Sequence, residues 1–421
     1  MSDYAVYTGA ITQSDHQPAI DGQHHAVWAI SNATRIDARG IQPHTWVIVD
    51  GTTIVATGTS TAAFTSACAC YHIPEQAIIN AQGSTITPGY IDIHAHGACG
   101  ASFDDGVEGI LTARHGHMIH GTTRQVLSLI TNPIDTMCAN LQTVHSLMAQ
   151  HPDILGSHLE GPFLAFARKG AHDPNCLIDP TPDVIARLLD AANGSLRQIT
   201  IAAEREHGLE AIRTLAQHGV VPALGHCDAD YDMAKRAYDA GARIMTHMFN
   251  AMNGIAHREP GPIPATLEDP RITIELINDG FHVANPVLRM ALAAAPHRIA
   301  FVTDAMAATC CPDGAYKLGA LDVRVQDGHA RLVSNGAIAG STLLLEVAVQ
   351  RAIFELGFAA PLAVEAATLT PARALGLDRA NAITTAPLGL LAPGYAADIL
   401  MQDEQWQVQR VWCNGAKIDT Q

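Results

Sequence analysis

The sequence of 421 residues has little positive charge. It holds 25 Lys and Arg against 41 Asp and Glu, a net charge of −16 at pH 7, and the positive residues are not gathered in any run. A chain without a basic stretch lacks the electrostatic footprint for nucleic acid or for an anionic membrane surface. We therefore expect neither as a partner, and an anionic ligand would have to be held by a few local cations.

Long apolar runs and paired cysteine motifs are also missing. No uninterrupted apolar run reaches the roughly 18 residues that a membrane helix needs. The first ten residues lack the basic and apolar regions of a secretory leader. The nine cysteines are odd in number, scattered and without CxxC spacing, which fits a reducing compartment better than a disulfide framework. We expect a cytoplasmic protein.

Charged residues make up only 16% of the chain and hydrophobic residues 48%, which is enough for a large buried core and excludes a disordered chain. Short alternating stretches rich in Val, Ile and Thr occur near both ends, for example at 45–56 and 396–418. Such alternation is typical of strands and hairpins. It predicts one small β-sandwich domain built from residues 1–85 and 385–421.

Residues 86–384 have a different hydrophobicity pattern. Short apolar runs alternate there with helical patterns such as 133–149, 183–192, 231–240 and 286–294. This alternation indicates βα units and a parallel sheet. Residues 316–333 are predicted to form an inserted hairpin, followed by helices at 342–355 and 362–375. The apolar runs predict eight strands, the count of a (β/α)8 catalytic barrel, at 86–94, 123–129, 155–159, 198–203, 221–225, 243–246, 273–277 and 298–302.

Six of the predicted strands end in side chains that can bind a metal or transfer a proton. A barrel of this kind places its active site at the carboxyl ends of its strands. In a strand, residues i and i+2 point to the same face, so His94 and His96 would face the barrel mouth together. Imidazoles with a carboxylate able to bridge suit one or two divalent ions such as Zn²⁺. The residues are Asp92, His94, His96, His158, Glu160, His226, His247, Asp279, His282 and Asp304.

The run PGYIDIHAHG at 88–97 resembles the first-strand signature of the amidohydrolase superfamily. Further stretches are similar to the N-acetylglucosamine-6-phosphate deacetylase family within it, and the resemblance extends from about residue 85 to the C-terminus. These stretches are HLEGPF at 158–163, KGAHDP at 169–174, THMFNAM at 246–252, HREPG at 257–261, VTDAM at 302–306, AGST at 339–342 and APGYAAD at 392–398.

The resemblance implies roles for individual residues. Glu160, His226 and His247 would hold the main metal, and His94 and His96 would complete a second site beside Asp304. Arg258 would reach the substrate phosphate across a homodimer interface; a surface salt bridge with Glu259 or Asp269 is the alternative. The implied contacts to an amino-sugar phosphate are Ala171, His172, Asn250, Ala251, Arg258, Asp279, His282, Ile338, Ala339 and Gly340.

Two residues depart from the family pattern. Cys227 follows the strand-five histidine where the family usually has Ser, and Ala203 precedes Glu204 where the family usually has Pro. Neither position is a ligand, so the implied chemistry stays intact.

The expected reaction is metal-dependent hydrolysis of the acetamide of N-acetyl-D-glucosamine 6-phosphate, giving D-glucosamine 6-phosphate and acetate, in amino-sugar catabolism. Asp304 would take the proton of the attacking water and pass it to the amine, and His282 would donate to the carbonyl oxygen. The metal would be one or two ions per chain, zinc first, with iron, manganese or cobalt as alternatives.

Three alternatives remain. One is a deacetylase of N-acetylgalactosamine 6-phosphate or an amidohydrolase acting on another small amide. A cyclic-ureide enzyme is disfavoured because Glu160 stands where those enzymes carry a modified lysine. A metal-binding protein without catalysis is disfavoured because Asp304 is present. The epimer, the metal and the oligomer stay open.

Overall fold

The structure, a computed structural model, describes residues 27–420. The N-terminal segment without leader features and the first 26 residues of the expected β domain lie outside the described residues. None of the helices in residues 27–420 is long and apolar enough to cross a membrane.

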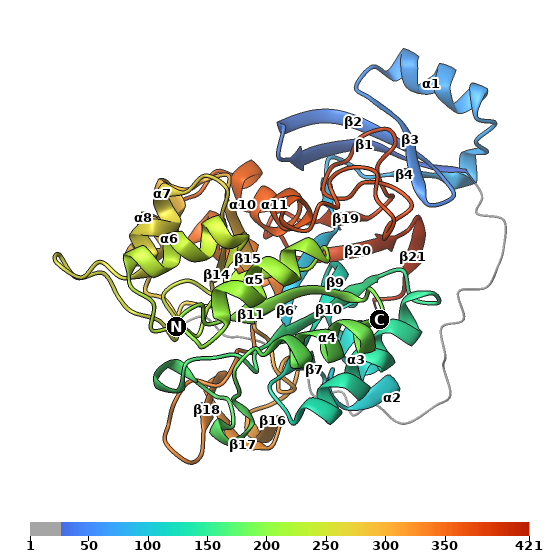
Figure 1. Ribbon diagram of the computed structural model, residues 1–421. Coiled ribbons are helices and arrows are strands. Elements are labelled where there is room, and N and C mark those ends of the chain that lie inside the picture. Colours follow the sequence, from blue (N-terminus) through green and yellow to red (C-terminus); the bar gives the residue numbers. More distant parts are fainter. Residues whose placement is uncertain (1–26, 421) are drawn as a thin grey trace.

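The centre of the molecule is a barrel of eight strands, which confirms the predicted (β/α)8 architecture (Figure 1). Neighbouring strands are parallel and follow one another in chain order. The strands are β6 (Tyr90–Ala95), β9 (Thr122–Ile130), β10 (Ile154–Glu160), β11 (Leu196–Ile201), β12 (Val221–Leu224), β13 (Ile244–Met245), β14 (Thr273–Ile277) and β15 (Ile299–Val302).

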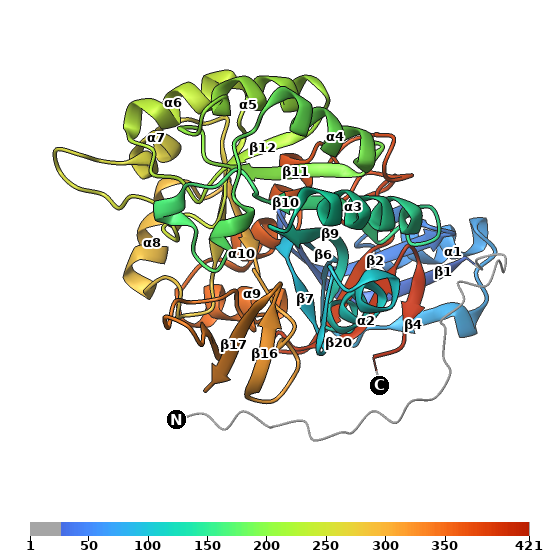
Figure 2. The same ribbon diagram turned by 60° about the horizontal axis from the view of Figure 1, so that its bottom comes forward.

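Helices surround the barrel (Figure 2), and β9 and β10 are buried along their whole length because parallel strands have both faces covered. In α4 the buried residues include Ile185, Leu188 and Ala192, the spacing of one helical face. The helices are α2 (Gly106–Ile119), α3 (Ile134–Met148), α4 (Pro182–Ala192), α5 (Gly208–Gln217), α6 (Tyr231–Ala240), α7 (Pro262–Glu268), α8 (Asn285–Ala294), α9 (Leu345–Phe354), α10 (Ala360–Ala367) and α11 (Leu369–Ala374), with short 3-10 turns at Phe166–Arg168 and Pro174–Cys176.

The barrel closes where its last strand meets its first. The Asp304 N–H donates to the His94 carbonyl at 2.8 Å, and the His96 N–H donates to the Ala305 carbonyl at 2.7 Å. The Thr303 hydroxyl donates to the buried Asp92 carboxylate at 2.6 Å. This closure brings residues that lie more than 200 positions apart in the chain to one point.

Strands from both ends of the chain form one further sheet of eight strands, which confirms the predicted β domain of two terminal parts. Val47 and Val49 share a core with Ile399 and Trp412, while Trp46 and Ile48 face a second core beside α1 (Thr61–Cys70). The sheet contains β1 (Trp28–Asp37), β2 (Gly40–Asp50), β3 (Thr53–Gly58), β4 (Ile78–Asn80), β5 (Thr85–Pro88), β19 (Ile399–Gln402), β20 (Val408–Cys413) and β21 (Ala416–Ile418), with a 3-10 turn at Glu75–Ala77 before β4.

The predicted strand at 86–94 is two strands in two sheets. β5 pairs with β19 in the terminal sheet, whereas β6 pairs with β9 in the barrel. Gly89 separates them, and a Cβ atom there would lie 2.1 Å from the Thr123 hydroxyl oxygen, so only glycine lets the chain pass this close. The domain limits after residues 85 and 384 stay a prediction.

Two further elements differ from expectation. The predicted helix at 362–375 breaks into α10 and α11 at Thr368, whose φ of −135° is not helical. The predicted hairpin at 316–333 is a three-stranded antiparallel sheet of β16 (Gly314–Leu318), β17 (Leu321–Gln326) and β18 (His329–Leu332). It shares a core with Ile130 and Ala171, so this sheet packs at the same end of the barrel as the strand-end residues. A small ladder of β7 (Gly97–Ala98) and β8 (Ala101–Ser102) follows β6.

Candidate active site

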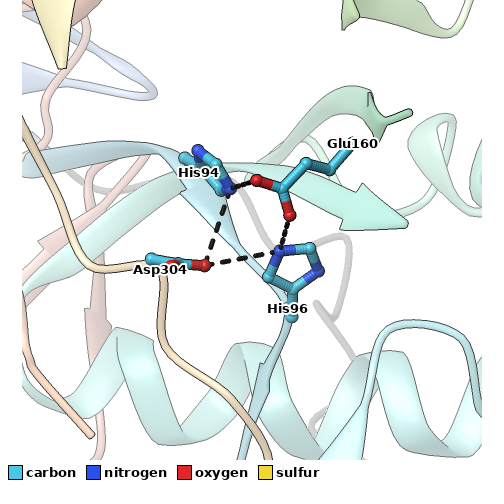
Figure 3. A group of neighbouring side chains, drawn as sticks. All are labelled: His94, His96, Glu160 and Asp304. Atoms are coloured by element: carbon cyan, nitrogen blue, oxygen red, sulfur yellow. Dashed lines mark hydrogen bonds and ion pairs between the residues drawn. The ribbon is translucent and has the colours of Figure 1, made fainter. Parts of the chain in front are cut away.

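Four buried side chains face one another at the carboxyl ends of the strands (Figure 3). Glu160, the last residue of β10, lies with Oε1 3.3 Å from His94 Nε2 and Oε2 3.0 Å from His96 Nε2. Asp304, two residues after β15, has Oδ1 3.6 Å from His94 Nε2 and 3.5 Å from His96 Nε2. The four residues therefore surround one position.

Glu160 also belongs to a second group. Its Oε1 lies 3.1 Å from His226 Nε2 and 3.0 Å from His247 Nε2, and these two nitrogens are 3.0 Å apart. Within each group the potential ligand atoms all lie within 4.8 Å of one another. The structure thus brings the six sequence-predicted ligands together, with Glu160 shared between both groups.

The donor atoms fit divalent metal ions. His94 Nε2 is buried and forms no hydrogen bond within the described residues, although it faces two carboxylates. Burial lowers the pKa of His94, but Glu160 and Glu275 raise it, and the net pKa stands well above the usual range. Nitrogen and carboxylate ligands of this kind are typical of zinc, and iron, manganese and cobalt also accept them.

Backbone geometry aims the ligands. His226, His247 and Asp304 have φ values of +46°, +25° and +49°, in or beside the left-handed region that non-glycine residues rarely adopt. Each stands where the chain turns sharply away from a strand end. Such backbone conformations cost free energy and cluster at functional sites. The fold therefore directs these side chains toward a common centre at the expense of local backbone strain.

Other predicted site residues line the same end of the barrel. His172 is buried with Nε2 3.3 Å from Glu160 Oε2; burial lowers its pKa to about 4 although Glu160 raises it. His282 Nδ1 donates to Asp279 Oδ2 at 2.6 Å, and the Asn250 amide donates to the His247 carbonyl at 3.1 Å.

Five small or apolar residues of the predicted substrate set come from three loops. Ala171 and Ala339 are buried in one cluster with Met306, and Ile338 bridges to Arg331. A Cβ atom on Gly340 would lie 2.9 Å from the Asp304 carbonyl oxygen, so glycine is needed for this close approach. Ala251 lies in the left-handed region with a φ of +50°.

Arg258 is not brought to the ligands. It lies in the segment between β13 and α7, which projects from the barrel (Figure 1). The side chain is exposed and forms no hydrogen bond or ion pair within residues 27–420. Neither alternative salt bridge, with Glu259 or with Asp269, is formed within the described residues; Asp269 pairs with Arg271 instead, at 2.5 Å.

Sequence reasoning did not assign a role to Glu275 and Gln198, which lie directly behind the ligands. Glu275 Oε2 lies 3.0 Å from His94 Nδ1, and Gln198 Nε2 donates to Glu275 Oε1 at 2.7 Å. The signal available in the sequence is a glutamate in the middle of the apolar strand Thr273–Ile277. A buried charge is costly unless it is paired, so a glutamate in the middle of such a strand indicates a carboxylate with a specific partner.

Comparison with known proteins agrees with this geometry. A profile of the Amidohydrolase family matches residues 85–418, which cover the barrel and the C-terminal strands. The chain belongs to the amidohydrolase family.

Similar members of this amidohydrolase family include sugar-phosphate deacetylases. The N-acetylgalactosamine-6-phosphate deacetylase of Escherichia coli O157:H7 is 35% identical over 78% of this chain and 86% of that relative. The N-acetylglucosamine-6-phosphate deacetylase of Vibrio furnissii is 33% identical over 79% of this chain and 82% of that relative. A solved structure of a Mycobacterium smegmatis N-acetyl-D-glucosamine-6-phosphate deacetylase variant, in complex with N-acetyl-D-glucosamine-6-phosphate, superposes with a TM-score of 0.85 at 37% identity, covering 93% of this chain and 99% of that one.

Proposed function

We propose that this amidohydrolase removes the acetyl group from N-acetyl-D-glucosamine 6-phosphate, giving D-glucosamine 6-phosphate and acetate, with one or two divalent metal ions per chain. The observation that carries the proposal is the buried ligand group with Glu160 shared between two sets of histidines. The Vibrio furnissii relative and the Mycobacterium smegmatis complex support the substrate.

Asp304 is proposed as the proton carrier of the reaction. A divalent ion held by Glu160, His226 and His247 would lower the pKa of water and polarise the amide carbonyl. The Asp304 carboxylate belongs to the neighbouring group that shares Glu160, and its backbone is fixed by the His94 carbonyl. It accepts the proton of the attacking water and returns it to the amine nitrogen as the C–N bond breaks.

His282 is proposed to stabilise the negative charge that develops on the carbonyl oxygen. Asp279 accepts hydrogen bonds from the His282 ring and from the His282 N–H, so the ring is held in one orientation. Because Nδ1 donates to Asp279, Nε2 is the ring nitrogen left to donate to the carbonyl oxygen, which it does when the ring carries both protons. A preorganised donor of this kind contributes about 3 kcal/mol to lowering the barrier.

The finer assignments rest on chemistry and family resemblance. We propose zinc as the metal, since the ligands are imidazoles and carboxylates, and a homodimer in which Arg258 reaches the partner's substrate phosphate. Its exposure and freedom from partners within residues 27–420 support that role. The nine cysteines are all free, which supports a cytoplasmic location.

Acetate release from a panel of N-acetyl hexosamines, each with and without the 6-phosphate, tests the proposal. We expect the highest kcat/KM for N-acetylglucosamine 6-phosphate and a large loss without the phosphate. N-acetylgalactosamine 6-phosphate is the second candidate, favoured by the Escherichia coli O157:H7 relative, and a preference for it would replace the first. No acetate release from any phosphorylated sugar would contradict both.

A further inference from the structure

Glu275 is a fully buried carboxylate in the middle of β14, behind the metal ligands. Its Oε2 accepts a hydrogen bond from the His94 ring at 3.0 Å and another from the His247 N–H at 3.2 Å. Its Oε1 accepts from Gln198 Nε2 at 2.7 Å. Glu275 therefore contacts one residue of each ligand group and belongs to neither.

His94 differs from the other ligand histidines in what its distal nitrogen meets. His226 Nδ1 lies 2.7 Å from the Arg168 carbonyl, while Nδ1 of His96 and of His247 has no partner within the described residues. Only His94, among these four in the described chain, has a carboxylate behind it. This contact keeps the proton on Nδ1, so the Nε2 lone pair faces Glu160 and Asp304, and it makes the imidazole a stronger ligand.

Charge balance points to the same residue. Two divalent ions would bring four positive charges into a buried site. Glu160 and Asp304 supply two negative ones, and the proton that Asp304 takes from the attacking water leaves this sum unchanged. An uncompensated buried charge is strongly unfavourable, and Glu275 supplies a third negative charge within hydrogen-bonding distance of His94.

We propose that Glu275 is the positioning residue on which the second metal ion depends: through His94 it orients and charge-balances the site of His94, His96 and Asp304. The inference rests on the metal dependence in the proposed function. It adds that binding of the second ion depends on Glu275 and binding of the first ion does not. The ion held by Glu160, His226 and His247 does not depend on the charge of Glu275, because Glu275 contacts that group only at a backbone N–H.

Glu275→Gln isolates the charge. The amide keeps the shape and can still accept from His94, and Gln198, whose own amide oxygen lacks a partner in the described residues, can rotate to pair with it. Metal-free protein would be titrated with Zn²⁺ by calorimetry, with bound zinc counted by elemental analysis. We expect the wild type to bind two ions and the variant to keep the first unchanged, with the second weakened about 10- to 100-fold.

Glu365→Gln is the matched control, because Glu365 is also buried and also pairs with a histidine, His297, at 2.8 Å, away from the site. It should bind both ions like the wild type. Glu275→Asp, which keeps the charge but shortens the side chain, should retain the second ion better than Glu275→Gln. If Glu275→Gln fails to fold, Glu275→Asp alone tests the proposal. Wild-type affinity for the second ion in Glu275→Asp, in which the carboxylate lies farther from His94, would then overturn it.

Three results would overturn the proposal: two ions at wild-type affinity in Glu275→Gln, loss of both ions together, or an Asp variant no better than the Gln variant. Metal counting needs no substrate, so these results are independent of the deacetylation panel. A failure of the proposed substrate with intact zinc binding would leave the role of Glu275 standing.

Discussion

At the scale of single residues, the site contains one carboxylate that stays charged and a second one that we propose moves a proton. Glu160 accepts contacts from five histidines; burial raises its pKa, but His94 and its other partners lower it, to well below the usual range. It stays anionic. Asp304, the proposed proton carrier, approaches two of these rings within the described residues, at 3.5 and 3.6 Å.

Asp304→Asn should therefore abolish turnover and leave substrate binding largely intact, because the amide keeps the shape but cannot accept a proton. We expect kcat to fall by more than about 100-fold, with the Kd for substrate changed only slightly in calorimetry. A variant that keeps more than a tenth of the wild-type kcat would show that another group is the base.

At the scale of elements, α2 is joined to the segment after β6 by a fully buried histidine. His117 Nε2 donates to the Gly97 carbonyl at 3.1 Å, and burial lowers the pKa of His117 to about 3 although that hydrogen bond raises it. Between about pH 6.5, where an unfolded histidine titrates, and pH 3, the unfolded chain binds the extra proton. Stability is therefore present above this window and falls as the pH drops through it.

His117→Gln should make the free energy of unfolding less dependent on pH between 6.5 and 4.5, by about 1.4 kcal/mol per pH unit. Urea unfolding followed at several pH values measures this slope. His115→Gln, at an exposed position of the same helix, is the control and should leave the slope unchanged. An equal slope in His117→Gln and wild type would contradict the assignment.

At the scale of the whole molecule, a buried ion pair joins the barrel to the terminal sheet. Arg124 of β9 meets Asp398, the residue before β19, through two hydrogen bonds of 2.6 and 3.1 Å. Removing one partner leaves a buried charge unpaired, at a cost of about 3–5 kcal/mol. Asp398→Ala should lower the Tm by roughly 5 °C, whereas Asp135→Ala, in an exposed ion pair with Arg187, should barely change it. Equal effects would show that the pair does not hold the two parts together.

The proposed homodimer gives a further prediction at this scale. Arg258→Ala should lower kcat/KM for phosphorylated substrate by roughly 30- to 150-fold, the loss of a charge-assisted hydrogen bond, and leave the unphosphorylated sugar unchanged. Mixing Arg258→Ala chains with Asp304→Asn chains should restore part of the activity, because a mixed dimer contains one site with both residues intact. No recovery after verified subunit exchange would place Arg258 in its own chain's site.

The sequence by itself determined the eight barrel strands and the six candidate ligands, since burial on both faces leaves short apolar runs and a strand end is a local feature. Helix α1 was not predicted because it has no buried residue and hence no apolar period. Only the tertiary structure decided that 86–94 divides between two sheets, because pairing partners lie far away in the chain. It also decided that Glu275 lies behind His94, which is 181 residues away in the chain. The order of the strands around the barrel brings these two residues together, and no pattern of neighbouring residues in the sequence predicts that contact.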